Sequence, residues 1–184
     1  MIKIRKARIG DAAALFAIAR EVSKVPGFLT KEPNEIRIKD VRSDLKQLIA
    51  GPGCYYVAEH KNQLIGYGLL SPLPSQAMSH VFRLTVVVVP AQINRGVGSR
   101  LLQTLLEWAV KDPKVEKIEM TIRAGNQRAL HVYQKFGFSV EGRFRWRARL
   151  PSGELVDELA LSWFPKLAMI YRPRRRIIPR RSES

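Results

Sequence analysis

Residues 84–102 read LTVVVVPAQINRGVGSRLL, a run that begins with β-branched residues and ends in an apolar helical pattern. Four successive valines before Pro90 suit a central strand that is buried on both faces. After Gly98, apolar residues recur at the spacing of an amphipathic helix. Because Gly96 and Gly98 lack side chains, a ligand phosphate can approach the main chain, where the first N–H groups and the dipole of the helix favour an anion. The run predicts either a pyrophosphate-binding turn or a turn whose glycines only ease the change from strand to helix.

Two common nucleotide-binding patterns do not fit this turn. It lacks the Gly-Lys-Ser/Thr ending of a P-loop, and Leu101 stands where a dinucleotide-binding fingerprint has its third glycine. The turn also lies in the middle of the chain, after a predicted hairpin, and does not open repeated βαβ units. These differences disfavour an ATPase or a dehydrogenase. They favour a cofactor with a pyrophosphate and an extended arm that lies along the strand before the turn.

Strand and helix patterns continue on both sides of this run. A half-buried strand around Ile4 precedes a helix at residues 12–19, with Asp11 as its N-cap. A loop over residues 23–36 follows, and then a second helix that ends at Gly51. The other predicted elements are a hairpin over residues 54–70, a strand at 117–122, a helix at 126–136 and a closing hairpin formed by 139–150 and 155–164.

The composition describes a globular protein with an unusual charge. Of its 184 residues, 46% are hydrophobic and 26% are charged, so we expect one domain over residues 1–165. Lysine and arginine number 32 against 16 acidic residues, and the resulting net charge of +16 favours polyanions such as phosphates, nucleic acid or acidic membranes. We expect residues 166–184 to be a basic, disordered tail.

The cysteine content and the lengths of the apolar runs indicate in which cellular compartment the protein is expected. Cys54 is the single cysteine, which excludes a disulfide-stapled secreted fold and favours a reducing compartment. The N-terminus alternates charged and apolar residues and lacks the core of a signal peptide. No apolar run approaches the roughly 20 residues that a helix needs to cross a bilayer. We therefore expect a cytoplasmic protein without a membrane span, and, since the histidines and the cysteine lack metal-ligand spacing, without a metal.

Three segments together resemble the GNAT superfamily of acyl-CoA-dependent N-acetyltransferases. They are the valine strand at 84–90, the turn and helix at 95–102, and NQRALHVYQKFGF at 126–138. The order of elements agrees over residues 2–164. The resemblance implies an α/β fold with a mixed, mostly antiparallel twisted sheet of about seven strands, flanking helices and a splayed parallel central pair. It also implies that acetyl-CoA gives its acetyl group to a primary amine of a small molecule, protein or peptide, by direct attack in a ternary complex.

The resemblance also implies roles for individual residues. Main-chain groups of Val86 and Val88 hold the pantetheine arm and the thioester carbonyl, with an N–H exposed by a local bulge in the strand. Asn126 binds the arm from the second helix, and Tyr133 protonates the departing thiolate. The pyrophosphate is bound by the main-chain amides of Arg95, Gly96, Val97, Gly98 and Ser99. Ile93 stands where the family usually has Arg or Gln, which removes a polar group but no backbone donor.

The general base is not carried over by the resemblance. An alkylammonium must lose a proton before it can attack a thioester. Many relatives carry a carboxylate in the central strand, but Arg83 occupies the matching position. Three residues are candidates, acting directly or through water: Glu32 and Glu35 in the loop between the first two helices, and His80 at the entrance of the central strand.

Basic and aromatic residues alternate in the first strand of the closing hairpin, where Arg143, Arg145, Arg147 and Arg149 flank Phe144, Trp146 and Ala148. One face of this strand then presents four guanidiniums. They bind nucleic acid, bind an acidic group of the substrate, or form a solvated face paired with Asp157 or Glu158. A second hypothesis for the chain is a catalytically weak acyl-CoA-binding or RNA/ribosome-binding module that uses this strand and the tail. The hairpin also offers an edge for pairing in a homodimer.

Overall fold

The computed structural model describes residues 1–25 and 32–166 of the chain. Within this part, seven strands form one sheet in the order β1-β2-β3-β4-β5-β7-β6, and only β4 and β5 pair in parallel. The strands are β1 (Lys3–Lys6), β2 (Cys54–His60), β3 (Gln63–Pro72), β4 (Val81–Val88), β5 (Lys117–Arg123), β6 (Ser139–Arg149) and β7 (Leu155–Trp163). The helices are α1 (Ala12–Ser23), α2 (Ile38–Ala50), α3 (Val97–Lys111) and α4 (Gln127–Lys135), with short 3₁₀ turns η1 (Ile9–Asp11), η2 (Gln76–Met78) and η3 (Pro90–Gln92). The predicted fold class is confirmed, and the predicted tail lies outside the described residues from position 167 onward.

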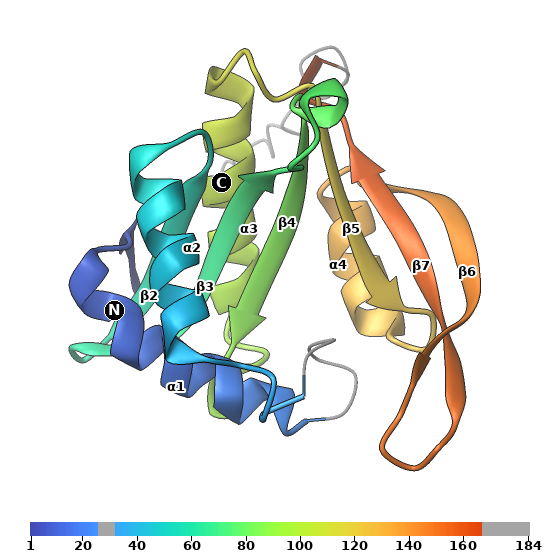
Figure 1. Cartoon of the computed structure of the whole chain (residues 1–184), viewed down its shortest axis with the longest axis horizontal. Helices are drawn as coiled ribbons and strands as arrows, with labels where there is room; N and C mark the ends of the chain where they lie inside the picture. The colour runs from blue at the N-terminus through green and yellow to red at the C-terminus, as the bar shows by residue number, and fades with distance from the viewer. Residues whose placement is uncertain (26–31, 167–184) are drawn as a thin grey trace, which may run out of the picture.

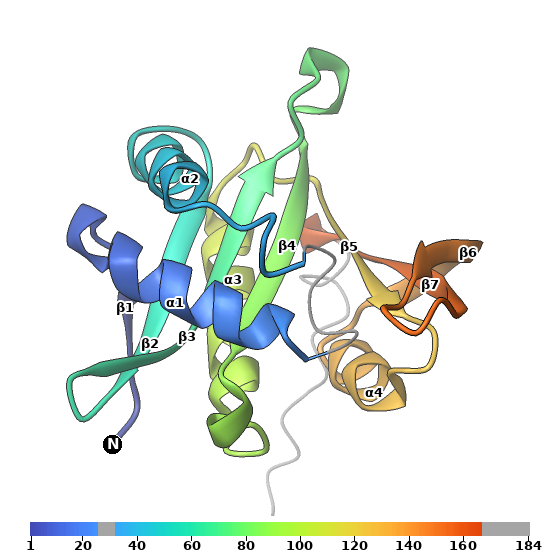
Figure 2. The same ribbon diagram turned by 60° about the horizontal axis from the view of Figure 1, so that its bottom comes forward.

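Two helices cover each face of the sheet (Figures 1 and 2). Leu15 of α1 and Leu45 of α2 are fully buried in one core, against residues of β2 and β3. Leu105 of α3 is fully buried in the other core, which also receives apolar residues of α4, and Phe82 of β4 lies at its centre. Successive side chains of β4 point to opposite faces of the sheet, and helices cover both faces. The sequence of β4 is therefore apolar at almost every position. No helix in the described ranges is long and apolar enough to cross a membrane.

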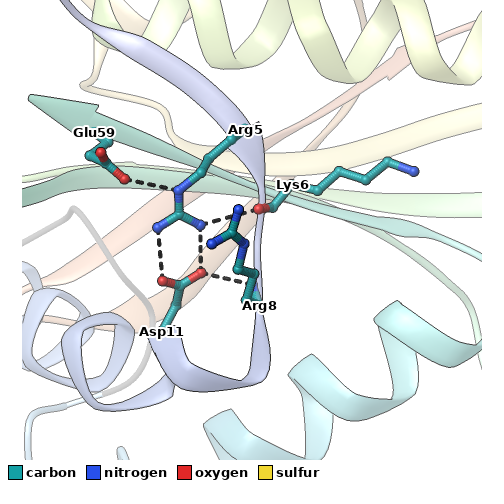
Figure 3. A network of polar contacts seen from close by, with 5 residues as sticks. All are labelled: Arg5, Lys6, Arg8, Asp11 and Glu59. Atoms are coloured by element: carbon teal, nitrogen blue, oxygen red, sulfur yellow. Dashed lines mark hydrogen bonds and ion pairs between the residues drawn. The ribbon is translucent and has the colours of Figure 1, made fainter. Parts of the chain in front are cut away.

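An ion-pair network fastens the first strand to the start of α1 (Figure 3). The Arg5 guanidinium donates to both carboxylate oxygens of Asp11, at 2.8 and 2.9 Å, and its Nε donates to Glu59 of β2 at 2.9 Å. Asp11 also accepts the N–H of Arg8 at 2.7 Å. The predicted N-cap position is confirmed, but the Asp11 carboxylate makes no capping hydrogen bond to α1; it accepts the N–H that precedes the 3₁₀ turn and binds Arg5.

Replacing Asp11 by alanine is expected to lower the free energy of unfolding at pH 7 by about 1 to 3 kcal/mol, the range for losing hydrogen bonds to a charged group. The hydrogen bond from Arg5 lowers the pKa of Asp11 in the folded chain. The stabilisation is therefore present above the ordinary carboxyl pKa and is lost as the pH falls through the lower, folded value. Urea unfolding at pH 7 and near pH 3 checks this, because the difference between the two proteins should shrink at acid pH. Glu21→Ala, which removes an exposed carboxylate of α1, is the control and should change little.

Candidate active site

The parallel strands β4 and β5 separate along their length (Figure 1). They pair only where residues 81–83 face residues 117–119. On its other side, β4 stays paired with β3 as far as Val88. One edge of β4 is thus without a strand partner over residues 84–88, within the described part of the chain. The predicted splayed central pair is confirmed, but the predicted bulge is not, because the β3–β4 register is continuous and the exposed edge results from the divergence of β5.

Main-chain groups of Val86 and Val88 face the gap between the diverging parts of β4 and β5. The C=O of Val81 accepts from Leu73, and the N–H of Val89 donates to Ile65 on β3. Since the direction of main-chain groups alternates along a strand, odd-numbered residues of β4 bond to β3 and even-numbered residues point toward β5. The strand therefore offers N–H and C=O groups to an extended ligand at the two positions that the resemblance implies.

The turn after β4 exposes the N-terminus of α3. Asn94 and Gly96 adopt left-handed conformations, with φ of 67° and 75°, and Gly96 is the N-cap. A side chain at Gly96 would be strained by this φ, although nothing lies within 4 Å of its Cβ position. No side chain caps α3, and the N–H groups of Val97 and Gly98 belong to its first turn, so no intrahelical partner is available to them. Together with the adjacent N–H groups of Arg95, Gly96 and Ser99, they are the five consecutive main-chain donors predicted to bind a pyrophosphate, here called the cradle.

Basic side chains surround the cradle unevenly. Arg95 and Arg100 are exposed on the turn and the first part of α3, and Arg128 is exposed near the start of α4. Arg123 precedes Arg128 by a few residues, but its guanidinium forms an ion pair with the carboxylate of Glu158, with an N···O distance of 3.0 Å. Three exposed guanidiniums close to helix N-termini produce a positive potential that favours a polyphosphate ligand.

Asn126 and Tyr133 are presented by α4 on the other side of the gap. The Asn126 Oδ1 accepts the N–H of Ala129 at 3.0 Å, so this residue caps α4 and keeps its amide N–H₂ for another partner. The ring of Tyr133 is half-buried and packs edge-on against Phe138, with the ring centroids 5.4 Å apart. Burial raises the pKa of Tyr133 to about 12, which keeps its hydroxyl protonated at neutral pH.

The candidate bases lie in two different places. Glu32 and Glu35 are exposed just before α2, and the Glu35 carboxylate accepts the N–H of Glu32 at 2.7 Å. His80 is exposed at the end of the sheet where β4 and β5 are still paired. At about 3.3 Å per residue, the main chain of His80 is roughly 20 Å along the strand from Val86. The structure therefore does not bring His80 together with the Val86 and Val88 groups.

A buried carboxylate that the sequence did not single out for the site is Glu158 of β7, which is 6% exposed. Its neighbours Leu159 and Leu161 pack toward α4, so Glu158 lies on the opposite face, the one that carries α1 and α2. It accepts from Arg123, its register partner at the end of β5 nearest the gap. In one of the three alternatives for the arginines of β6, Asp157 or Glu158 pairs with them. Asp157 does pair with Arg143, at 2.6 Å, whereas Glu158 pairs with Arg123. Its true partner depends on the pairing of β5 with β7, which no local pattern indicates.

The comparisons with known proteins agree with this geometry. Residues 20–138 match the acetyltransferase (GNAT) family. The L-amino acid N-acetyltransferase AaaT of Escherichia coli is 32% identical over 116 residues, which cover 63% of this chain and 66% of AaaT. The match thus spans just under two thirds of the length of AaaT. An acetyltransferase of the GNAT family from Streptococcus pneumoniae has a TM-score of 0.84 at 25% identity, with 89% of this chain and 99% of that chain covered. A putative acetyltransferase from Salmonella typhimurium, determined with its cofactor acetyl-CoA, has a TM-score of 0.82 at 17% identity, with 90% and 94% covered. The strand, the glycine turn and the matched segment thus lead to one conclusion: the chain belongs to the GNAT family of acetyltransferases.

Proposed function

We propose that this chain is an N-acetyltransferase that uses acetyl-CoA and a primary amine, which attacks directly while both substrates are bound. The observation that carries the proposal is the unpaired edge of β4, which leads straight to the open N-terminus of α3. An extended arm fits the unpaired edge of β4, and a pyrophosphate fits the N-terminus of α3. The named activity of AaaT and the acetyl-CoA bound by the Salmonella neighbour support the same co-substrate.

The residues around the gap suit acetyl-CoA because they offer hydrogen-bond donors and leave room beside the Gly98 main chain. Beyond its chain neighbours and the backbone of its own helix, a Cβ at Gly98 would come no closer than 3.7 Å to the nearest atom, a methyl group of Val88, so the described residues leave room for a ligand atom beside the main chain there. The first-turn N–H groups of α3 would bind the pyrophosphate, and Val86 and Val88 would hold the pantetheine arm. The free amide N–H₂ of Asn126 would bind the arm from the other side.

The acetyl thioester, when bound, supplies an electrophilic carbonyl and a thiol leaving group. A main-chain N–H of Val86 or Val88 would bind the negative charge that develops on the carbonyl oxygen, which is how backbone donors lower barriers in acyl transfer. Tyr133 would hold a proton at its Oη for the departing sulfur, a role for which its raised pKa is suited.

The amine would approach from the face that carries α1 and α2. Glu32 and Glu35 stand in the segment that leads into α2 on this face, and they are our candidates for removing the ammonium proton, directly or through water. Glu158 lies on the same face, but its carboxylate is already engaged in an ion pair with Arg123. We therefore assign it the role of an electrostatic partner of the incoming ammonium.

Acetyl-CoA binding and an amine panel test the proposal together. Isothermal titration should show one acetyl-CoA site per chain, and no detectable binding at millimolar acetyl-CoA would refute the proposal. Release of CoA should then be measured with free amino acids, peptides with a free N-terminus, aminoglycosides and spermidine. Binding without turnover of any amine would instead support an acyl-CoA-binding module.

A further inference from the structure

The closing hairpin departs from a regular pair of strands at one place. Strand β6 is the last strand of the sheet, and its pairing with β7 is interrupted between Phe144 and Ala148. Figures 1 and 2 show the hairpin extending beyond the end of β5, away from α1 and α2. The alternation predicted from the sequence, with four guanidiniums on one face, is therefore broken, and residues 145–147 form a bulge.

The bulge presents an indole ring to solvent. Trp146 is 73% exposed, and its φ of 51° lies in the left-handed region that a bulky residue rarely adopts. Asp157 fixes this conformation, since one carboxylate oxygen accepts the Trp146 N–H at 2.8 Å and the other accepts the Nε of Arg143 at 2.6 Å. A large aromatic side chain held outside the core in an unfavourable backbone conformation points to a binding role.

Only part of the positive charge around Trp146 is balanced by a neighbouring carboxylate, since Asp157 interacts electrostatically with Arg145 as well as with Arg143. Asp157 is already engaged with Arg143, and within the described residues Arg145, Arg147 and Arg149 form no ion pair. The guanidinium of Arg147 lies over the exposed ring of Phe144, 5.3 Å from its centroid, so its plane is held in place. The bulge thus combines an exposed indole, a guanidinium that lies over an aromatic ring and an excess of positive charge.

We propose that this surface, residues 144–149, binds single-stranded nucleic acid. Unstacked bases stack on aromatic rings and guanidinium planes, and arginines bind the phosphates between them. The carboxylates of an acidic protein would pair with the arginines, but they would not stack on the exposed indole, whereas a nucleic acid supplies both phosphates and planar bases. The net charge of +16 adds general attraction for a polyanion, but it does not select this hairpin. These residues lie on β6, at the edge of the sheet, and none of them is assigned to acetyl-CoA, so the proposal does not depend on the proposed acetyl transfer.

Fluorescence anisotropy of labelled U16 and dT16 tests the proposal with the full-length chain. Trp146→Ala should weaken binding about tenfold, as expected when one base loses its stacking partner, and Trp146→Tyr should restore most of the affinity. The double variant Arg145→Gln/Arg147→Gln should reduce the slope of log K against log salt by about 1.4, because each phosphate that is no longer neutralised accounts for about 0.7. The matched control Lys39→Gln/Arg42→Gln removes the same charge from exposed positions of α2 and should leave both the slope and the affinity nearly unchanged.

Four results would overturn the proposal. Equal losses in the hairpin and α2 double variants would show binding by net charge alone. Loss of all affinity on deleting residues 172–184, with hairpin variants unchanged, would assign binding to the tail. Competition by polyglutamate as effective as unlabelled U16 would indicate an acidic protein partner. Unchanged acetyl-CoA affinity in each variant shows that the fold is intact, and a folded Trp146→Ala that binds U16 and dT16 like wild type also refutes the proposal.

Discussion

Gly98→Asp is expected to weaken acetyl-CoA binding about a hundredfold or more. The new carboxylate would stand at the first turn of α3, among the N–H groups that we assign to the pyrophosphate. At about 4 Å, two like charges near a protein surface repel by about 1 to 4 kcal/mol, and a hundredfold change in affinity corresponds to about 2.7 kcal/mol. Isothermal titration with acetyl-CoA measures the change.

Gly98→Ala separates this charge effect from simple crowding. Its Cβ would meet the Val88 methyl at 3.7 Å, an ordinary contact, so acetyl-CoA affinity should stay within about threefold of wild type. Alanine also favours a helical position over glycine, so the variant should be at least as stable as wild type. If Gly98→Asp binds acetyl-CoA normally, the glycines serve only to ease the change from strand to helix, and the phosphate cradle is wrong.

Tyr133→Phe is expected to lower kcat about 10²- to 10³-fold, the usual contribution of a positioned general acid, with acetyl-CoA affinity almost unchanged. Burial raises the pKa of Tyr133 to about 12, so its hydroxyl keeps its proton until the pH approaches that value. A group with a raised pKa loses its acid function only above that pKa, so we expect no decline of wild-type kcat from this residue between about pH 6 and pH 10. Steady-state rates with the best amine, measured over this range, provide the test.

Tyr55→Phe is the matched control for this variant. Tyr55 loses the same hydroxyl, but it is buried in the core under α1 and α2, on the other face of the sheet from α4. The kcat of Tyr55→Phe should remain close to that of wild type, even if the free energy of unfolding is lowered. Equal rates for wild type and Tyr133→Phe would remove Tyr133 from the catalytic residues and leave the thiolate to depart without a protein acid.

Local patterns predicted those parts of the fold that depend on neighbours in the chain. The change from β-branched residues to helical spacing around Pro90 predicted where β4 ends and α3 begins, at Val88 and Val97. The hairpin turn was also predictable, because Lys61 and Asn62 form a tight connection in which both residues have positive φ. These features need only a few consecutive residues to determine their conformation.

Features that depend on pairing between distant segments escaped prediction. Glu158 is bound by Arg123 because β7 inserts between β5 and β6, and neither strand carries a signal of that order. The bulge at Trp146 was hidden by a regular alternation of basic and aromatic residues. In each case, long-range packing overrode a correct local preference.

The divergence of β4 and β5 divides the sheet into two arms, β1 to β4 and β5 to β7. Only three register pairs of strand residues join the arms directly. A ligand arm bound along Val86 and Val88 would complete the edge of β4 in the manner of an added strand. The co-substrate would then be a structural part of the sheet as well as a reactant, and its arrival and departure would change how firmly the two halves of the molecule hold together.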